Sequence, residues 1–400
     1  MKAILLAAGE GKRMRPLTAN RPKVMLPLAN KPILEHLLIE AVKAGVSDFI
    51  FIVGYHNEQV RGYFGSGKEW GVNISYASQQ KQMGTADALW MVQDSIDSKF
   101  LLINGDIILK SHDLEKMMGA ECTTLGITAV EDTRNLGAVE VSGDNVIRIY
   151  EKAPEAPSNM ANTGVYLFTP EIFSAVSQTL KSPRGEFEIT DFLQLMIDNG
   201  YDIHYHEFSS WLDLSYPWDL LSANESLLGS IEARNLGKIE SNVVVQGNVS
   251  IGAGTVVRSG SYIVGPVIIG ANCDIGPNCY IRSCTCIGDG CHIGSAVEVK
   301  NSIVMKDSKV PHHNYLGDSV VGEGCNFGAG TKVANLRLDK KNVRVANIDT
   351  RRRKLGAIIG DGVETGINAS INTGSIIGYG TRIGPGAVAS GFIKPGSRIL

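Results

Sequence analysis

A loop rich in glycine and cations follows the first apolar run of the chain. It carries Gly9, Gly11 and Arg13, and Lys23 follows about ten residues later. Glycines let the backbone come close to a phosphate, and the two cations supply charge to it. The loop lacks the third glycine of a dinucleotide fingerprint and the Gly-Lys-Ser/Thr ending of a P-loop. Taken alone, it fits either a phosphate site or a plain tight turn.

Two aspartates follow apolar segments that lie far apart in the chain. Asp106 comes after a run without charges, and Asp213 comes directly after Trp211 and Leu212. Two carboxylates from distant strands can hold Mg²⁺ against the α-phosphate of a nucleotide and help to orient an in-line attack. Each aspartate alone also fits a strand-end cap.

The elements that must position these residues alternate along the chain. Residues 2–8 are apolar enough for a buried strand, residues 32–44 have the apolar period of a helix, and residues 49–53 predict the next strand. This βαβ unit predicts an α/β, Rossmann-like sheet. Ligands of such sheets bind at the carboxyl ends of the strands.

The second half of the chain repeats every six residues. This period suits neither an amphipathic helix nor simple strand alternation, but it fits a parallel β-helix in which each hexapeptide forms one face. The aliphatic positions of the ladder are Val245, Ile251, Val257, Ile263, Ile269, Ile275, Ile281, Ile287, Ile293 and Val299.

The ladder then resumes twice. The later positions are Val321, Phe327, Val333, Ile359, Thr365, Ile371, Ile377 and Ile383. We therefore expect two loops, at about 306–320 and 334–358. Because insertions in a repeat normally map to a face that binds something, we expect a second activity there.

Length and charge narrow the class of protein. A chain of 400 residues is too long for one core, and we predict two domains, 1–228 and 229–400. A net charge of −3 offers no general attraction to nucleic acid or to an anionic membrane. The apolar start is too short for a signal peptide and no stretch approaches a membrane span, so we expect a cytoplasmic protein.

Four of the seven cysteines lie two residues before a ladder position. In that slot strand alternation points a second side chain inward, so we interpret these cysteines as small packing residues. Cys284 and Cys286 do not fit this slot, and no cysteine spacing resembles a zinc site. The four are Cys273, Cys279, Cys291 and Cys325.

Most of the first predicted domain resembles the sugar-1-phosphate nucleotidylyltransferases. The shared hallmark is the run Gly-x-Gly-x-Arg-(Met/Leu)-x-Pro-x-Thr, with a lysine further on, which begins here at Gly9. The resemblance implies that Arg13 and Lys23 are catalytic and that Asp106 and Asp213 bind Mg²⁺, with Asp219 as the substitute ligand. It further implies nucleotide contacts by Gly9, Gly11, Gln79, Gln82, Gly84 and Thr85, and sugar phosphate contacts by Gly137, Glu151, Lys152, Asn162 and Thr163.

The implied reaction is nucleotidyl transfer. A phosphate oxygen of the sugar 1-phosphate attacks the α-phosphorus of a nucleoside triphosphate, UTP or dTTP, and pyrophosphate leaves. Arg13, Lys23 and Mg²⁺ would contribute charge stabilisation and alignment, since this transfer needs little covalent chemistry from the protein.

The stretch from Val310 to Thr331 sharpens the resemblance. It matches bifunctional enzymes that join a uridylyltransferase to a left-handed β-helix acetyltransferase, with a histidine three residues before a tyrosine and an Asn-x-Gly-Ala-Gly-Thr coil. The left hand comes from this resemblance, since the period does not supply it. The matching acetyltransferase positions are His312, Tyr315, Asn326 and Ala329.

The implied second reaction is N-acetylation by acetyl-CoA. It needs a base that takes a proton from the attacking amine, and a histidine suits this task. We favour His312, although the adjacent His313 remains an alternative and a polar loop is the plain interpretation of both.

The second interruption adds further candidates for the acetyltransferase site. Asn335 fits the asparagine of the next family motif, although Leu336 follows where a tyrosine is usual. Lys341 and Arg344 are our candidates for the sugar phosphate. The run Arg351–Lys354 fits either the CoA phosphates or a surface.

Together these features predict a bifunctional enzyme that converts glucosamine 1-phosphate to UDP-N-acetylglucosamine. Its partners would be small-molecule substrates, with neither nucleic acid nor membrane, and relatives with this β-helix imply a homotrimer. One alternative is a glucose- or mannose-1-phosphate nucleotidylyltransferase whose β-helix serves assembly or regulation. A non-enzymatic nucleotide-sugar sensor is less favoured because the charged residues are retained.

Overall fold

The chain folds into two compact units. The computed structural model describes residues 1–81, 83–134, 136–151, 153, 155–173 and 185–400. None of the helices in this part of the chain is long and apolar enough to cross a membrane. The first unit comprises Met1–Glu10, Arg21–Met25 and Ile33–Asp213, and the second comprises Gly11–Asn20, Leu26–Pro32 and Leu214–Leu400.

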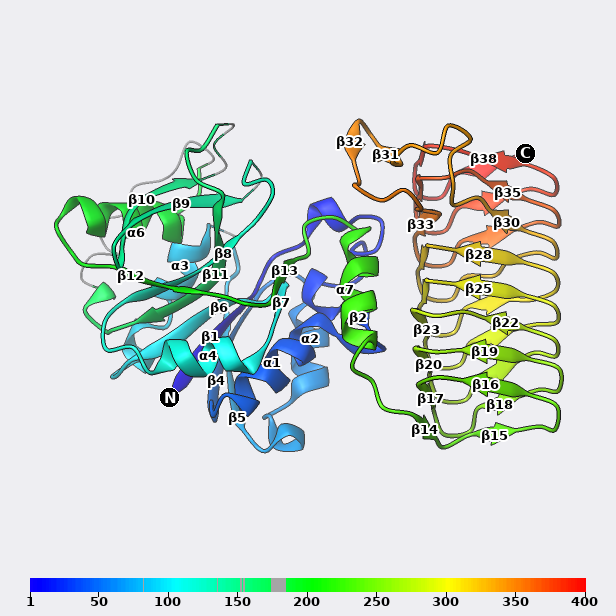
Figure 1. Cartoon of the computed structure of the whole chain (residues 1–400), viewed down its shortest axis with the longest axis horizontal. Coiled ribbons are helices and arrows are strands. Elements are labelled where there is room, and N and C mark those ends of the chain that lie inside the picture. The colour runs from blue at the N-terminus through cyan, green and yellow to red at the C-terminus, as the bar shows by residue number, and fades with distance from the viewer. Residues whose placement is uncertain (82, 135, 152, 154, 174–184) are drawn as a thin grey trace. The chain divides into compact units, whose positions relative to one another are not determined.

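The first unit contains a mixed sheet and helices (Figure 1). Its strands are β1 (Lys2–Ala7), β4 (Asp48–Val53), β5 (Asn73–Ser78), β6 (Phe100–Asn104), β7 (Ile107–Leu109), β8 (Thr124–Ala129), β9 (Gly137–Ser142), β10 (Asn145–Glu151), β11 (Met160–Phe168), β12 (His204–Glu207) and β13 (Trp211–Asp213). Its α-helices are α1 (Ile33–Lys43), α2 (Asn57–Phe64), α3 (Thr85–Trp90), α4 (Ser111–Met118) and α6 (Ile189–Asp198). Its short 3-10 helices are η2 (Lys23–Met25), η3 (Lys68–Trp70) and η4 (Gln93–Ser95).

Helices cover both faces of this sheet. The strand order is β5-β4-β1-β6-β11-β8-β12-β10-β9. Along β1, Ala3 and Leu5 pack with residues of α1, α2 and α4, whereas Ile4 packs with residues of α3 and α6. Alternate side chains of a strand point to opposite faces, so the apolar run of β1 fills two cores at once.

The predicted βαβ opening is confirmed. β1 and β4 pair in parallel, with α1 between them in the chain. β5 and β6 extend this parallel part, while β11 pairs with β6 antiparallel, so the sheet is mixed. The carboxyl ends of β1, β4, β5 and β6 therefore lie at one edge, where the sequence predicts the nucleotide.

The second unit contains short strands and few helices. Its segments before residue 229 are η1 (Lys12–Met14), β2 (Pro27–Leu28), β3 (Lys31–Pro32) and α7 (Asp219–Leu228). The first strands after it are β14 (Arg234–Asn235), β15 (Lys238–Ile239), β16 (Val244–Gln246), β17 (Val249–Ile251), β18 (Val256–Val257), β19 (Tyr262–Val264), β20 (Val267–Ile269), β21 (Asp274–Ile275), β22 (Tyr280–Ile281), β23 (Thr285–Ile287), β24 (His292–Ile293), β25 (Glu298–Lys300) and β26 (Ile303–Val304). The others are β27 (Lys309–Val310), β28 (Tyr315–Gly317), β29 (Val320–Val321), β30 (Lys332–Val333), β31 (Arg344–Val345), β32 (Ile348–Asp349), β33 (Ala357–Ile359), β34 (Glu364–Thr365), β35 (Ser370–Ile371), β36 (Ser375–Ile377), β37 (Arg382–Ile383), β38 (Val388–Ala389), β39 (Phe392–Ile393) and β40 (Arg398–Ile399).

These strands stack into three parallel sheets. Consecutive strands enter the sheets in rotation, so β17, β18 and β19 pair with β20, β21 and β22 of the next coil. The arrangement is consistent with a parallel β-helix, which we call the solenoid (residues 234–400). We name its three faces by their first strands: the β14 face, the β15 face and the β16 face.

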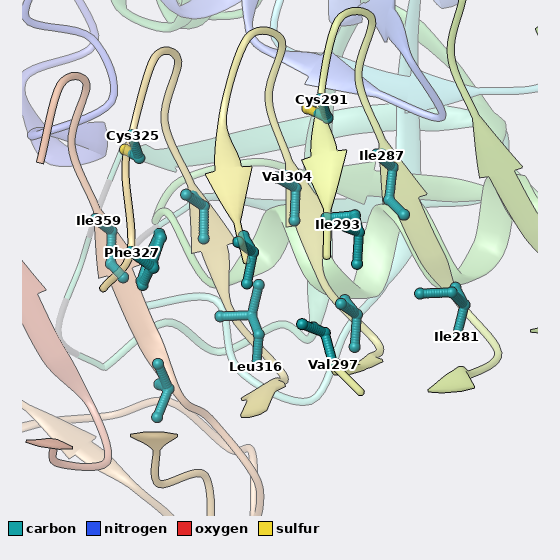
Figure 2. Close-up of a cluster of buried hydrophobic side chains, with 14 of the residues drawn as sticks. Ile281, Ile287, Cys291, Ile293, Val297, Val304, Leu316, Cys325, Phe327 and Ile359 are labelled. Carbon is teal, nitrogen blue, oxygen red and sulfur yellow. The ribbon is translucent and has the colours of Figure 1, made fainter. Parts of the chain in front are cut away.

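The ladder side chains fill the interior of the solenoid. Figure 2 shows residues from successive coils in one buried cluster, among them Ile281, Ile293, Cys325 and Ile359. Val245, the first ladder position, is the exception, with 39% of its surface exposed in the first coil. Stacking of equivalent side chains explains why one six-residue period is visible through so many turns.

The predicted loop at 306–320 is wrong. Ile269 pairs with Ile287, which lies three full hexapeptides further on, and Ile287 pairs in turn with Val304. The second step is one residue shorter than the first, so counting in sixes loses the frame while the strands continue through β27, β28 and β29. Val304 pairs in turn with Val321, and this step is again one residue short, so the apparent interruption consists of two slightly shortened coils inside a continuous solenoid.

The second predicted interruption is confirmed. Val321 pairs with Ile359, a step along the chain that is more than twice as long as a regular coil. The extra chain contains the antiparallel hairpin of β31 and β32 (Figure 1). We call the chain between β30 and β33 the excursion. Leu336 and Lys354 form an antiparallel bridge near its two ends.

Part of the outer surface of the β14 face is covered. Cys286 points outward there, and its thiol donates to Asn224 Oδ1 of α7 at 3.1 Å. The same oxygen accepts from Ala29 N at 3.0 Å, and Asn224 Nδ2 donates to Cys284 O at 3.2 Å. Residues 26–32 and α7 thus belong with the solenoid by contact, and the boundary at residue 228 stays a prediction.

The interpretation of the four ladder cysteines as packing residues is confirmed. Cys273, Cys279, Cys291 and Cys325 are buried in the solenoid core. Burial raises the thiol pKa of Cys279 to about 11 and that of Cys325 to about 12. A raised pKa leaves little thiolate near neutral pH, and the thiolate is the reactive form.

We therefore expect these four thiols to resist alkylation in the native protein. At pH 8 a thiol reagent should modify the partly exposed Cys122 and Cys284 first, and all seven cysteines should react only after denaturation. Mass spectrometry of the labelled peptides would measure the order. Modification of Cys325 at the rate of Cys122 would contradict this account.

Candidate active sites

Two glycines let the loops converge at the carboxyl edge of the first sheet. Ala8 O accepts from Tyr55 N at 3.2 Å, and Leu6 O accepts from Gly105 N at 2.9 Å. A Cβ atom would lie 2.8 Å from Ala8 O if placed on Gly54, and 2.5 Å from Leu6 O if placed on Gly105. No larger residue fits at either position without a backbone shift.

A cavity of about 400 Å³ opens at this edge. Gln79 lines it, as expected of a base-reading residue, and its side chain is 6% exposed. A cavity of this size suits a small ligand with a few polar contacts. The lining residues are Glu10, Val53, Gly54, Tyr55, Asn57, Ser78, Gln79 and Gln80.

The segment after Gln79 is clamped by the chain around residue 187. Gly84 has a positive φ of 112°, and a Cβ there would lie 2.2 Å from Phe187 O. The hydroxyl of Thr85 accepts from Ile189 N at 3.0 Å, so this predicted nucleotide ligand helps to hold the start of α6. Gln82, another predicted contact, lies outside the described residues.

The predicted metal carboxylates lie close together in the first unit. Asp213 pairs with Ile107 across the β13–β7 ladder, and Ile107 directly follows Asp106. Lys23 Nζ contacts Asp106 Oδ2 at 2.6 Å. The Asp106 side chain is 37% exposed, and carboxylates that water can reach suit Mg²⁺, which usually keeps several water ligands. No group of three or more possible metal ligands occurs in the described part of the chain. These residues therefore fit the ion.

Asp219, the alternative metal ligand, has a structural contact in the second unit. Its Oδ2 accepts from Tyr216 N at 2.6 Å at the start of α7. Arg13 belongs to the same unit, and its guanidinium lies 5.6 Å from the ring centre of Tyr216. Gly11, also in the second unit, has a φ of 70°, which favours glycine, whereas Gly9 belongs to the first unit.

Three predicted sugar phosphate residues are neighbours. Gly137 pairs with Glu151 across the β9–β10 ladder. A Cβ on Gly137 would lie 3.2 Å from Glu151 Oε2 and 3.4 Å from Asn162 Cβ. The amide of Asn162 donates to Tyr166 Oη at 2.8 Å, and burial, with Glu151 nearby, raises the pKa of that phenol. Asn162 Oδ1 also accepts from Gly164 N at 2.9 Å, so the Glu151 carboxylate and the second N–H of the Asn162 amide are the groups that can contact sugar hydroxyls.

Thr163 faces the other way. Its hydroxyl donates to Gly126 O at 2.9 Å, its carbonyl accepts from Trp211 Nε1 at 2.9 Å, and it is 1% exposed. Its side chain holds strands together and is not placed to contact a ligand. Lys152, the remaining predicted residue, lies outside the described residues.

In the solenoid, the predicted base lies at a corner between two faces. His312 occupies the turn between β27 of the β15 face and β28 of the β16 face, with its side chain exposed. Its carbonyl accepts from Gly330 N of the next coil at 3.0 Å, so Ala329 lies beside it. His312 and His313 have φ values of 38° and 57°, in the left-handed region of backbone conformation. Both side chains are exposed to solvent. Asn326 bridges Lys309 and Glu364 on the β15 face.

A buried carboxylate organises the neighbouring β16 face. Asp318 is 2% exposed and accepts from Lys300 Nζ at 2.9 Å and from Asn301 Nδ2 at 2.9 Å. Asn335 Nδ2 donates to the same carboxylate and to Tyr315 Oη. The structure thus brings together the predicted residues Tyr315 and Asn335. Asp318, the carboxylate that Asn335 contacts, was not identified from the sequence.

A glycine makes this arrangement possible. A Cβ on Gly317 would lie 2.6 Å from both Asn335 Nδ2 and Tyr315 Oη. Burial raises the pKa of Tyr315, so its phenol stays protonated and can donate a hydrogen bond.

Two cations of this face escaped the sequence reasoning. Lys300 pairs in register with Gly317. Arg282 lies one coil earlier and contacts Glu298 Oε1 at 2.9 Å, and Glu298 pairs with Tyr315. Residues about three hexapeptides apart stack in adjacent coils, so the sequence spacing could have placed Arg282 and Lys300 near Tyr315. The candidate cations predicted from the sequence instead come from the loops.

The cations predicted from the excursion have other surroundings. Arg344 donates to Asn347 O at 2.6 Å within the β31–β32 turn, and the Lys341 backbone bonds to Asp339. Both side chains are exposed. From the arginine run, Arg352 Nη2 contacts Glu225 Oε1 of α7 at 2.5 Å, so this residue fixes the excursion within its own unit.

Two family models match different parts of the chain. Residues 2–230 match the family model described as nucleotidyl transferase, and residues 263–377 match that described as GMPPB C-terminal domain. A crystal structure of a Bacillus anthracis protein described as a putative glucose-1-phosphate thymidylyltransferase, in complex with a sucrose, superposes with a TM-score of 0.54 and 30% identity. It covers 59% of this chain and 98% of that one.

Full-length relatives are also present. The bifunctional protein GlmU of Methanococcus maripaludis strain C7 is 43% identical over 99% of this chain and 96% of its own length. A bifunctional sugar-1-phosphate nucleotidylyltransferase/acetyltransferase of Sulfurisphaera tokodaii is 37% identical over 98% of this chain and 97% of its own.

The chain therefore belongs to the nucleotidyl transferase family, among its bifunctional nucleotidylyltransferase/acetyltransferase members. The predictions of this family, of an enzyme and of two transferase activities are confirmed. The alternative with a solenoid that serves only assembly or regulation is not favoured, because the relatives named bifunctional match over nearly the whole chain.

Proposed function

We propose that the enzyme acetylates glucosamine 1-phosphate with acetyl-CoA and then joins the product to a uridylyl group from UTP. The products are UDP-N-acetylglucosamine and pyrophosphate, with dTTP as a second nucleotide substrate. The observation that carries this proposal is the pair of sites in one chain: Lys23, Asp106 and Asp213 in the first unit, and His312 and Asp318, which precede and follow β28, in the second.

In nucleotidyl transfer, the protein mainly positions and stabilises charge. Lys23 would offset charge on the triphosphate as the sugar phosphate oxygen attacks the α-phosphorus and pyrophosphate leaves. Asp106 and Asp213 would hold a Mg²⁺ ion, which supplies positive charge next to the α-phosphate. Glu151 and Asn162 would bind hydroxyls of the sugar and so fix the direction of attack.

In acetyl transfer, His312 acts as the general base. The sugar amine attacks the thioester carbon, the bond from carbon to sulfur breaks, and CoA leaves with the electron pair. His312 takes a proton from the amine nitrogen, and the CoA sulfur receives a proton as it leaves. The protonated phenol of Tyr315 would donate a hydrogen bond to the bound substrate.

We assign the acceptor phosphate to Lys300 and Arg282 rather than to Lys341 and Arg344. The first pair shares the β16 face with Tyr315, and Asp318 fixes the position of Lys300. The second pair lies on an exposed excursion. A cation held by a buried carboxylate is already ordered, so less conformational entropy is lost when it binds phosphate.

Replacement of Lys300 by methionine should therefore raise the KM for glucosamine 1-phosphate at least about tenfold, because one charge-assisted hydrogen bond to the phosphate is lost. The change in KM would be measured by release of CoA thiol. Lys341→Met, the matched removal of an excursion cation, should change KM less than about twofold. A larger increase in KM for Lys341→Met than for Lys300→Met would assign the acceptor phosphate to Lys341.

We further propose a left-handed solenoid and a homotrimer. Val244, Tyr262 and Tyr280 form a half-exposed column on the β16 face. Such an apolar column supports association between copies, and light scattering would measure the mass of the assembly. We propose a cytoplasmic location, where both nucleoside triphosphates and acetyl-CoA are supplied.

The experiment that tests the function uses the purified full chain. Acetyl-CoA and glucosamine 1-phosphate should release CoA thiol, and UTP with N-acetylglucosamine 1-phosphate and Mg²⁺ should release pyrophosphate. Thiol release without added sugar, or the same rate with glucose 1-phosphate, would sink the acetyl-transfer proposal. Pyrophosphate release that is independent of the sugar phosphate would sink the other.

A further inference from the structure

The Gln79 carboxamide is fixed by two acceptors. Its Nε2 donates to Asp87 Oδ2 at 2.8 Å and to Gly84 O at 3.1 Å. A carboxylate and a carbonyl oxygen both accept hydrogen bonds, so the amide nitrogen must face them. Both N–H groups of Gln79 are then used within the protein.

The orientation of the nitrogen determines that of the oxygen. No donor within the described ranges 1–81, 83–134, 136–151, 153, 155–173 and 185–400 reaches Gln79 Oε1. The residue lines the cavity at the carboxyl edge of the sheet, together with Tyr55, Asn57 and Ser78. Gln79 therefore offers the cavity a hydrogen-bond acceptor and no donor.

Asp87 is itself held in place. It lies in the first turn of α3, and the start of this helix is tied down where Phe187 O accepts from Ala86 N at 2.9 Å. The hydroxyl of Thr85 accepts from Ile189 N on the same side. A carboxylate in the first turn of a helix is also stabilised by the backbone dipoles.

We infer that Asp87 is a positioning residue that selects the base through Gln79. An acceptor in the cavity matches the ring N3–H of uracil or thymine, whereas N3 of cytosine is itself an acceptor and would meet Gln79 Oε1 with like charge. A site built for one hydrogen-bond pattern rejects the opposite pattern strongly, because polar groups are left unpaired. The inference rests on the proposed uridylyl transfer and names the residue that sets its base preference.

The test compares UTP with CTP by release of pyrophosphate, with N-acetylglucosamine 1-phosphate as acceptor. Asp87→Leu removes the acceptor, so the Gln79 amide can turn, and the ratio of kcat/KM for UTP over CTP should fall at least about tenfold. Asp87→Asn keeps an acceptor oxygen and should retain the ratio within about threefold. Asp94→Leu, on η4, is the control for loss of an exposed carboxylate.

A double-mutant cycle separates positioning from general damage. If Asp87 acts through Gln79, then Asp87→Leu should cause no further fall of the ratio in a Gln79→Ala background. Release of CoA thiol by each variant reports whether the chain is folded, and Asp87→Ala replaces the leucine variant if it is not.

The outcomes are distinguishable. A UTP-preferring wild type whose ratio is unchanged in Asp87→Leu overturns the inference alone, as does an equal further fall in the Gln79→Ala background. A wild type that prefers CTP, or that uses neither UTP nor dTTP, overturns the proposed function and the inference together.

Discussion

Replacement of His312 by alanine is expected to lower kcat for acetyl transfer by about 10²–10⁴, the usual contribution of a general base. Because His312 lies on an exposed solenoid turn, its loss removes no core packing. Nucleotidyl transfer from UTP should keep its rate. Thiol release and pyrophosphate release from the same preparation would measure the two effects.

The adjacent histidine supplies the control for this experiment. His313 shares the left-handed turn and the exposure of His312. His313→Ala should therefore change acetyl transfer less than about threefold, a difference below about 1 kcal/mol in activation free energy. If the two variants exchange their effects, His313 is the base. Equal small effects would place the proton transfer on another group.

The solenoid could be predicted from the sequence because its interior repeats. Each inward slot must be filled, so Ile281, Ile287 and Ile293 recur at one spacing and predict the stacked coils. Counting in sixes fails where two successive coils are each one residue short, because strand pairing and not sequence spacing sets the register of Val304 and Val321. This is why a continuous stretch was predicted as a loop.

The sites were predictable only in part, for a related reason. Gly137 and Glu151 lie opposite one another in adjacent strands, which a motif can encode. Thr85 and Thr163 belong to equally good motifs, yet their hydroxyls bond to backbone groups. A motif gives the residue type but not the direction of the side chain. Asp318 was missed because its partner Lys300 comes from another coil.

The largest effect on the first activity is expected from Asp106→Asn. The amide oxygen of asparagine can still accept from Lys23, which now contacts Asp106 at 2.6 Å, so the local structure should persist. The site loses one of its two carboxylate charges, and with it affinity for Mg²⁺. We expect pyrophosphate release to fall about 10²–10³-fold, the scale of losing one transition-state electrostatic contact.

Magnesium dependence separates this effect from simple damage to the fold. Asp106→Asn and Asp213→Asn should both need more Mg²⁺ for half-maximal rate, because both carboxylates lie beside the β7–β13 pair. Asp219→Asn should leave that requirement unchanged, since its carboxylate serves Tyr216 N. All three variants should retain acetyl transfer. If Asp219→Asn were the one variant that needs more Mg²⁺, the assignment of Asp106 and Asp213 as metal ligands would be wrong, and Asp219 of the second unit would be the ligand.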